Sequence, residues 1–128
     1  MAVLGRDVLS KPALRQERVH VEEWGGEVIL RELTEEEVVA VNKLRQRGPF
    51  TKRGELDATA LGNYRRRILR LGWIDEDGNQ VLEEADEAEL TKQPFAIIDK
   101  LAARIAEMSG MMPGASGDAE KNSEATPG

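Results

Sequence analysis

A Trp-Gly-Gly turn between two apolar runs is the feature that most constrains how this chain folds. Residues 18–23 alternate between polar and apolar types, Gly25 and Gly26 follow Trp24, and residues 28–30 are again apolar. Glycine adopts the positive φ angles of a tight turn without steric cost, so this order is typical of a β-hairpin. The sequence therefore predicts an N-terminal hairpin whose turn lies beside Trp24.

The residues after the hairpin predict a helix with a defined start. Thr34 and Glu37 have the spacing of a capping box, in which each side chain accepts a hydrogen bond from the backbone N–H of the other residue. Apolar residues then recur with helical spacing until Gly48 and Pro49 end the run. The glutamates at 35–37 also favour this start, because the helix dipole is positive there.

A second helix is predicted after residues 48–57, a glycine-containing loop in which Phe50 and Leu56 are candidate anchors. This helix ends at Gly72, where the apolar periodicity stops. Its apolar stripe comprises Leu61, Tyr64, Ile68 and Leu71.

The C-terminal half predicts a small hairpin and then a long helix. Residues 73–82 have the pattern of an extended pair, an acidic turn with Gly78 and a return, and residues 86–90 that of one acidic helical turn. Pro94 suits the first position of the helix that follows. The apolar stripe of that helix, the strongest in the chain, comprises Phe95, Ile98, Leu101, Ala102, Ile105 and Met108.

These elements predict an α+β fold class: an N-terminal β-hairpin packed on a small bundle of about three helices, with a minor second hairpin. The segment after Met108 is dominated by Ser, Gly, Pro, Ala, Asp and Asn, and such a composition does not offset the entropy lost on ordering. We therefore expect a flexible arm at 1–16, a single folded domain at 17–108 and a disordered tail at 109–128.

Composition excludes most site chemistries. The chain has no cysteine and one histidine, His20, whose place opposite the apolar side of the first strand indicates a solvent-facing residue. Zinc sites, cysteine-based sites and a hydrolytic triad therefore lack their ligands or their base. The acidic turn at 75–79 lacks the spacing of a calcium loop. We expect no enzyme activity, no cofactor and no metal, and no apolar run approaches the roughly 20 residues of a membrane span.

Basic residues are concentrated in the middle of the chain. Residues 43–70 hold nine basic and two acidic side chains, while the flanking segments are acidic and the formal net charge is −6. Such a patch fits phosphate groups, an acidic partner or simply a solvated helix face. The arginines of the second helix are Arg65, Arg66, Arg67 and Arg70.

The alternative function suggested by this patch is a small winged-helix-like DNA-binding regulator. The order of helix, loop, helix and hairpin is that of a winged helix, with the helix at 65–70 as the recognition helix. The wing, however, would bring the three carboxylates at 75–77 toward a polyanion, which opposes binding. We therefore do not expect a nucleic-acid partner.

Four stretches occur in a set order along the chain: VHVEEWGGEVILRELTEEE at 19–37, GWIDEDG at 72–78, the amphipathic run at 95–108, and EKNS at 120–123. Together they resemble the tail assembly chaperones of long, non-contractile-tailed bacteriophages and their prophages. In that family a Val-x-x-Trp-Gly-Gly hairpin leads through a second strand into a Thr-capped helix. The segment at 47–57 and the Arg65–Arg67 run do not match the family pattern, so no role is carried over to them.

The resemblance implies a non-catalytic protein that acts in the host cytoplasm during virion assembly and is absent from the mature virion. Its implied partners are the phage tape-measure protein and the tail-tube protein, the second through a frameshift-extended form in which residues 109–128 would be a flexible tether. No membrane partner is implied. A long helical tape-measure protein exposes apolar surface, and a small acidic binder would protect that surface from aggregation.

Aromatic residues are the first candidates for a contact surface, because they are scarce here and dominate interface energetics. We expect an apolar groove beside the closing helix with Trp24 or Trp73 as its anchor. Each tryptophan also fits an ordinary core position, and that alternative stays open. The candidate partner-binding residues are Trp24, Trp73, Phe95, Ile98, Arg65, Arg66, Arg67 and Arg70.

Overall fold

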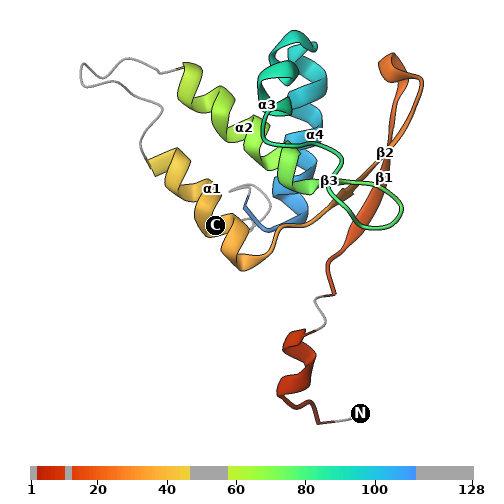
Figure 1. Cartoon of the computed structure of the whole chain (residues 1–128), viewed down its shortest axis with the longest axis vertical. Helices are drawn as coiled ribbons and strands as arrows, with labels where there is room; N and C mark the ends of the chain where they lie inside the picture. Colours follow the sequence, from red (N-terminus) through yellow and green to blue (C-terminus); the bar gives the residue numbers. More distant parts are fainter. Residues whose placement is uncertain (1–2, 11–12, 47–57, 112–128) are drawn as a thin grey trace, which may run out of the picture.

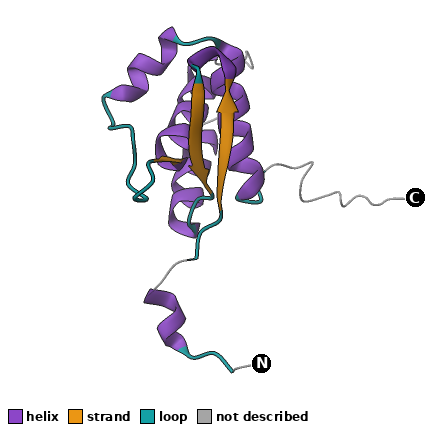
Figure 2. Ribbon diagram, turned by 90° about the vertical axis from the view of Figure 1, so that its right-hand side faces the viewer, coloured by secondary structure: helices purple, strands orange, loops and turns teal. Residues whose placement is uncertain are grey.

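The chain forms a small antiparallel sheet with helices packed on one of its faces (Figure 1, Figure 2). The computed structural model describes residues 3–10, 13–46 and 58–111. Over these ranges the predicted α+β class is confirmed. The elements in chain order, with η for a 3-10 helix, are η1 (Arg6–Ser10), β1 (Gln16–Val21), η2 (Glu22–Trp24), β2 (Gly26–Arg31), α1 (Glu35–Gln46), α2 (Ala58–Gly72), β3 (Trp73–Ile74), α3 (Asp86–Glu89), η3 (Leu90–Lys92) and α4 (Phe95–Met108).

The predicted N-terminal hairpin is present as β1 and β2. The two strands pair antiparallel, with Val19 opposite Val28. The short helix η2 forms the tip, and Gly25 closes it with a φ of 72°, a left-handed conformation that favours glycine. Trp24, the last residue of η2, is thereby held at the tip of the hairpin.

The second hairpin differs from its prediction in the partner of its first strand. β3 pairs with β2, with Ile29 opposite Ile74 and Leu30 opposite Trp73, so the sheet has the order β1-β2-β3. The return segment is reduced to a bridge between Ile74 and Gln80. Joining the main sheet buries Ile74, which is 2% exposed, whereas a free two-stranded ribbon would leave that side chain in water.

α1 begins at the predicted capping box, which is confirmed. The Thr34 hydroxyl accepts the N–H of Glu37 at 3.2 Å, and the Glu37 carboxylate accepts the N–H of Thr34 at 2.9 Å. The same carboxylate receives two N–H groups of Arg31, each at 2.8 Å. The N–H of Leu33 donates to the hydroxyl of Ser109 at 2.8 Å, so the start of α1 is tied to the end of α4.

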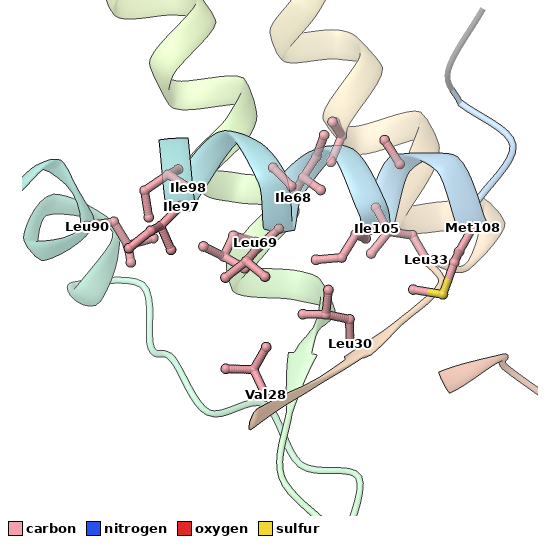
Figure 3. Packing of buried hydrophobic residues seen from close by; sticks show 14 of the residues in the cluster. Val28, Leu30, Leu33, Ile68, Leu69, Leu90, Ile97, Ile98, Ile105 and Met108 are labelled. Atoms are coloured by element: carbon pink, nitrogen blue, oxygen red, sulfur yellow. The ribbon is translucent and has the colours of Figure 1, made fainter. Parts of the chain in front are cut away.

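The hydrophobic core lies between the sheet and helices α2 and α4 (Figure 3). Leu30 of β2, Ile68 and Leu69 of α2, and Leu101 and Ile105 of α4 are each at most 2% exposed. These side chains come from the sheet and from both helices, so the hairpin, α2 and α4 stabilise one another.

The buried arc of α2 is wider than the predicted stripe. The prediction omitted Leu69, which is fully buried, while Tyr64 and Leu71 only border the core and the side chain of Leu61 lies outside the described residues. The reason is that α1, α3, α4 and β3 all contact α2, so more than one side of this helix is covered.

α4 carries the predicted amphipathic stripe with two corrections at its start. Pro94 is the N-cap residue, and the helix proper begins at Phe95. Phe95 is 65% exposed and therefore not part of the core, because its ring packs beneath the charged guanidinium group of Arg65 instead. Ile97 and Ala106, which the stripe omitted, are buried.

The N-terminal segment carries η1 away from the folded body (Figure 1). Its residues Val3, Leu4 and Leu9 are more than two-thirds exposed. β1 begins at Gln16, one residue before the expected boundary of the folded domain, and the division of the chain into arm, domain and tail stays a prediction.

The segment after α4 is described only for its first residues. The N–H of Met111 donates to the carbonyl of Ala106 at 2.8 Å, and the Met111 side chain packs against the core, so contacts with the domain continue beyond 108. The rest of the predicted tail, and the loop anchors Phe50 and Leu56, lie outside the described residues. Over the described part of the chain, no helix is both long and apolar enough to cross a bilayer.

Candidate partner-binding groove

The two tryptophans of the chain stack against each other. Trp24 comes from the hairpin tip and Trp73 from β3, with ring centroids 5.4 Å apart and ring planes inclined by 19°. Both are half-buried and border the core. The indole N–H of Trp24 donates to the side-chain oxygen of Gln93 at 3.1 Å, which joins the hairpin tip to the segment between η3 and α4. The two candidate anchors therefore form one aromatic unit.

A groove of about 250 Å³ opens on these rings, and we call it the tryptophan groove. Three separate segments build it: the hairpin tip, β3 with the loop that follows, and α3 with η3. Its lining combines apolar side chains with two carboxylates. The lining residues are Trp24, Trp73, Leu82, Asp86, Glu89, Leu90 and Gln93.

A smaller hollow of about 160 Å³ adjoins the tryptophan groove and shares Leu90 and Gln93 with it. It lies between α2, η3 and the start of α4. Four of the residues predicted from the sequence line it: Phe95, Ile98, Arg65 and Arg66.

Arg65 and Arg66 are engaged within the fold. Arg65 Nε lies 3.0 Å from Asp99 Oδ1 of α4, and its guanidinium carbon lies 5.0 Å from the ring centroid of Phe95. A cation placed over an aromatic face in this way is attracted by the ring quadrupole. Arg66 donates to Asn63 Oδ1 at 2.7 Å within α2 itself.

Arg67 and Arg70 both bind Glu87 of α3. Arg67 Nε donates to Glu87 Oε2 at 2.7 Å, and Arg70 Nε donates to the same oxygen. Burial raises the pKa of Glu87, but the hydrogen bonds and charges of Arg70 and Arg67 outweigh it, so the pKa is lowered from its ordinary value. This Arg67–Glu87–Arg70 clamp fixes α3 against α2.

These pairings do not favour the DNA-binding alternative. A recognition helix directs its arginines to phosphates and base edges, whereas Arg65, Arg67 and Arg70 are paired with carboxylates of α3 and α4. The four arginines of α2 are thus engaged in contacts within the described part of the chain.

The structure brings most of the candidate residues together without testing their role. Trp24 and Trp73 line the tryptophan groove, four others line the adjoining hollow, and Arg67 and Arg70 hold α3 beside both. Their function in binding stays a prediction. The acidic run at 86–90 was visible in the sequence, but its place in a groove was not. The lining residues that the sequence did not indicate are Leu82, Asp86, Glu89, Leu90 and Gln93.

Two larger hollows lie elsewhere on the described surface and do not contain aromatic side chains. One, of about 540 Å³, follows α1 beside Val39 and Lys43, and the other, of about 470 Å³, lies between β1 and α4 beside Val19 and Ala103. Size alone would favour these two. Aromatic anchors dominate interface energetics, so we take the tryptophan groove as the candidate site.

The described residues offer no metal site: no group of three or more His, Cys, Asp or Glu side chains is placed to hold an ion. His20 is exposed on β1, as expected for a solvent-facing residue. In the acidic turn, Asp75 Oδ1 accepts the backbone N–H groups of Asp77 and Asn79 at 2.9 and 3.0 Å. That carboxylate therefore closes the turn.

Neither a protein-family model nor a curated protein matches the sequence. The structure, however, is similar to the solved structure of the bacteriophage HK97 tail assembly chaperone, with a TM-score of 0.59 and 18% sequence identity. The two chains share a fold. The alignment covers 80% of this chain and 94% of the HK97 chaperone. The resemblance noted in the sequence to phage tail assembly chaperones is thus supported at the level of the fold.

Proposed function

We propose that this chain is a non-catalytic phage tail assembly chaperone that binds the tape-measure protein and aids recruitment of tail-tube subunits. The observation that carries the proposal is the fold shared with the HK97 tail assembly chaperone over 94% of that chain. The hairpin motif around Trp24 and the capped helix from Thr34 support the same family independently, because they were recognised from sequence alone.

The surface of the described domain suits this role. The tryptophan groove presents stacked, half-buried indole rings to the solvent, and Leu82 and Leu90 extend its apolar lining. Such a groove buries the apolar face of a helical partner and keeps that face from aggregating until tube subunits replace the chaperone. The formal net charge of −6 keeps the free chaperone soluble and disfavours nucleic acid as a partner.

Recruitment of tail-tube subunits is proposed to use a longer, frameshift-extended form. In that form the segment after Met111 connects the domain to an additional segment, and its Gly, Ser and Pro content suits a flexible tether. The chaperone acts in the host cytoplasm and leaves before the virion is complete.

Coexpression tests the proposal. The tape-measure protein of the same phage or prophage is expressed with and without this chain, and its soluble fraction is measured. The proposal predicts that the tape-measure protein is soluble only in the presence of this chain. Equal solubility in both cultures contradicts it, as does a duplex-DNA complex of the purified chain that persists at physiological ionic strength.

A further inference from the structure

The tryptophan groove combines an apolar lining with carboxylates. Four of its lining side chains are apolar or aromatic, two are the acids Asp86 and Glu89, and one is the amide of Gln93. Glu22 and Glu23 precede Trp24 in η2 and are exposed beside it in sequence. The side chains that line the groove therefore include no cation, and its charge is negative.

The Arg67–Glu87–Arg70 clamp explains why two acids of α3 are available to the groove. Glu87 faces α2, where both arginines hold it, and its side chain is 16% exposed. Asp86 and Glu89 are three residues apart in the same helical turn and therefore share another face, which lines the groove. The basic cluster of α2 thus acts on the groove indirectly, by orienting α3.

The existing partner of Glu89 is weakly bound. Lys92 Nζ lies 3.1 Å from Glu89 Oε1, but both side chains are about two-thirds exposed or more. Exposed pairs of this kind add little to stability, so an incoming cation replaces Lys92 at little cost. Asp86 Oδ2 accepts the N–H of Glu83 at 2.7 Å.

We propose that the tryptophan groove binds an amphipathic helix whose apolar stripe is flanked by lysine or arginine. The apolar stripe would cover Trp24, Trp73 and Leu90, and the flanking cations would face Asp86 and Glu89. A helix satisfies its own backbone hydrogen bonds, so it suits a lining made mostly of apolar groups and acceptors. The inference rests on the proposed function, in which the partner is a long helical protein.

The proposal is tested on the full chain with designed peptides and intrinsic fluorescence. Both tryptophans of the chain line the groove, so emission reports directly on its occupancy. The probes are three tryptophan-free peptides. The first is a helix with a leucine stripe flanked by lysines, and the second has the same stripe flanked by glutamates. The third contains the residues of the first peptide in scrambled order, which removes the stripe. We expect a saturable emission change with the first peptide and at least about tenfold weaker binding of the other two.

A charge reversal distinguishes binding in the groove from nonspecific attraction of a basic peptide to an acidic protein. Glu89→Lys leaves the core untouched and should weaken binding of the lysine-flanked peptide by about two- to tenfold. The matched control is Glu36→Lys on α1, which makes the same change in net charge at an exposed position outside the groove lining. Equal losses in the two variants, equal binding of the scrambled peptide, or binding without an emission change would each overturn the proposal.

Failure of this inference can be distinguished from failure of the proposed function. If the tape-measure protein is kept soluble by this chain but the lysine-flanked peptide does not bind, the partner uses another surface and this inference fails alone. If the peptide binds with the expected charge preference but the tape-measure protein stays insoluble, the groove is correctly described and the proposed function fails.

Discussion

The indole rings of Trp24 and Trp73 stack with their centroids 5.4 Å apart, although one belongs to the hairpin tip and the other to β3. Trp24 also donates its N–H to Gln93. The hairpin tip is therefore held from two directions, and the tryptophan groove exists because these contacts keep the tip beside α3 and η3.

Replacing Trp24 measures what the stacked ring contributes to the stability of the fold. Trp24→Ala removes a half-buried ring and its stacking contact with Trp73, so we expect a loss of about 2 kcal/mol in the free energy of unfolding, measured by urea denaturation. Trp24→Phe keeps an aromatic ring on Trp73 and loses the bond to Gln93 and part of the ring area, at a cost of about 1 kcal/mol. If Trp24→Ala is as stable as the wild type, the stack does not hold the tip.

The clamp on α3 predicts a large difference between two neighbouring glutamates. Glu87→Gln leaves Arg67 and Arg70 without their shared carboxylate, so we expect a loss of about 1–3 kcal/mol in unfolding free energy. Glu89→Gln, in the same helical turn but 66% exposed, should change it by less than about 0.5 kcal/mol. Chemical denaturation of the two variants measures this, and equal losses would show that the clamp does not stabilise α3.

The carboxyl groups of Glu37 and Glu87 make the free energy of unfolding depend on pH in the acidic range. Burial raises the pKa of Glu37, yet hydrogen bonds from Arg31 and Thr34 outweigh it, and the pKa of both Glu37 and Glu87 lies below the ordinary value of 4.5. Because the folded-state pKa is the lower one, each group's contribution is fully present above about pH 4.5 and disappears as the pH falls through the folded-state pKa. The unfolding free energy should therefore fall on acidification below that range.

The matched measurement is the double variant Glu37→Gln/Glu87→Gln. It is less stable at neutral pH and should lose less stability than the wild type between about pH 5 and pH 3, because its two amides do not titrate there. Parallel pH profiles for the two proteins would place the acid-sensitive groups elsewhere.

Helix α2 ends in close contact with α4, and a methyl group tests that contact. A Cβ at Gly72 would lie 2.6–2.9 Å from three side-chain atoms of Ile105, which is fully buried. We expect Gly72→Ala to cost about 1–3 kcal/mol in unfolding free energy. Gly26→Ala is the control, because its Cβ meets no atom within 4 Å. Similar thermal unfolding of both variants would contradict the packing described.

Local signals in the sequence were sufficient for the hairpin and for the start of α1. The Gly25 turn and the Thr34–Glu37 capping box depend on residues close together in the chain, and both were predicted correctly. The two tryptophans were also singled out as candidates, and their role in binding stays a prediction, but nothing local indicated that they would stack.

Contacts between distant segments account for what the sequence did not reveal. Leu69 is buried because several elements surround α2, and Phe95 is exposed because Arg65 offers its ring a partner outside the core. The pairing of Arg67 and Arg70 with Glu87 depends on where α3 docks, so two arginines that by composition fit a nucleic-acid patch belong to a structural clamp. Periodicity within one helix does not contain this information.

The most direct test is to purify the coexpressed pair through a tag on the tape-measure protein and to measure the mass of the complex by analytical ultracentrifugation. We predict that this chain remains bound to the tape-measure protein, and that a large part of the bound chain is lost with Trp24→Ala but not with Glu36→Lys. A tape-measure protein that purifies as a soluble species free of this chain would contradict the central claim that this protein works by covering the surface of another.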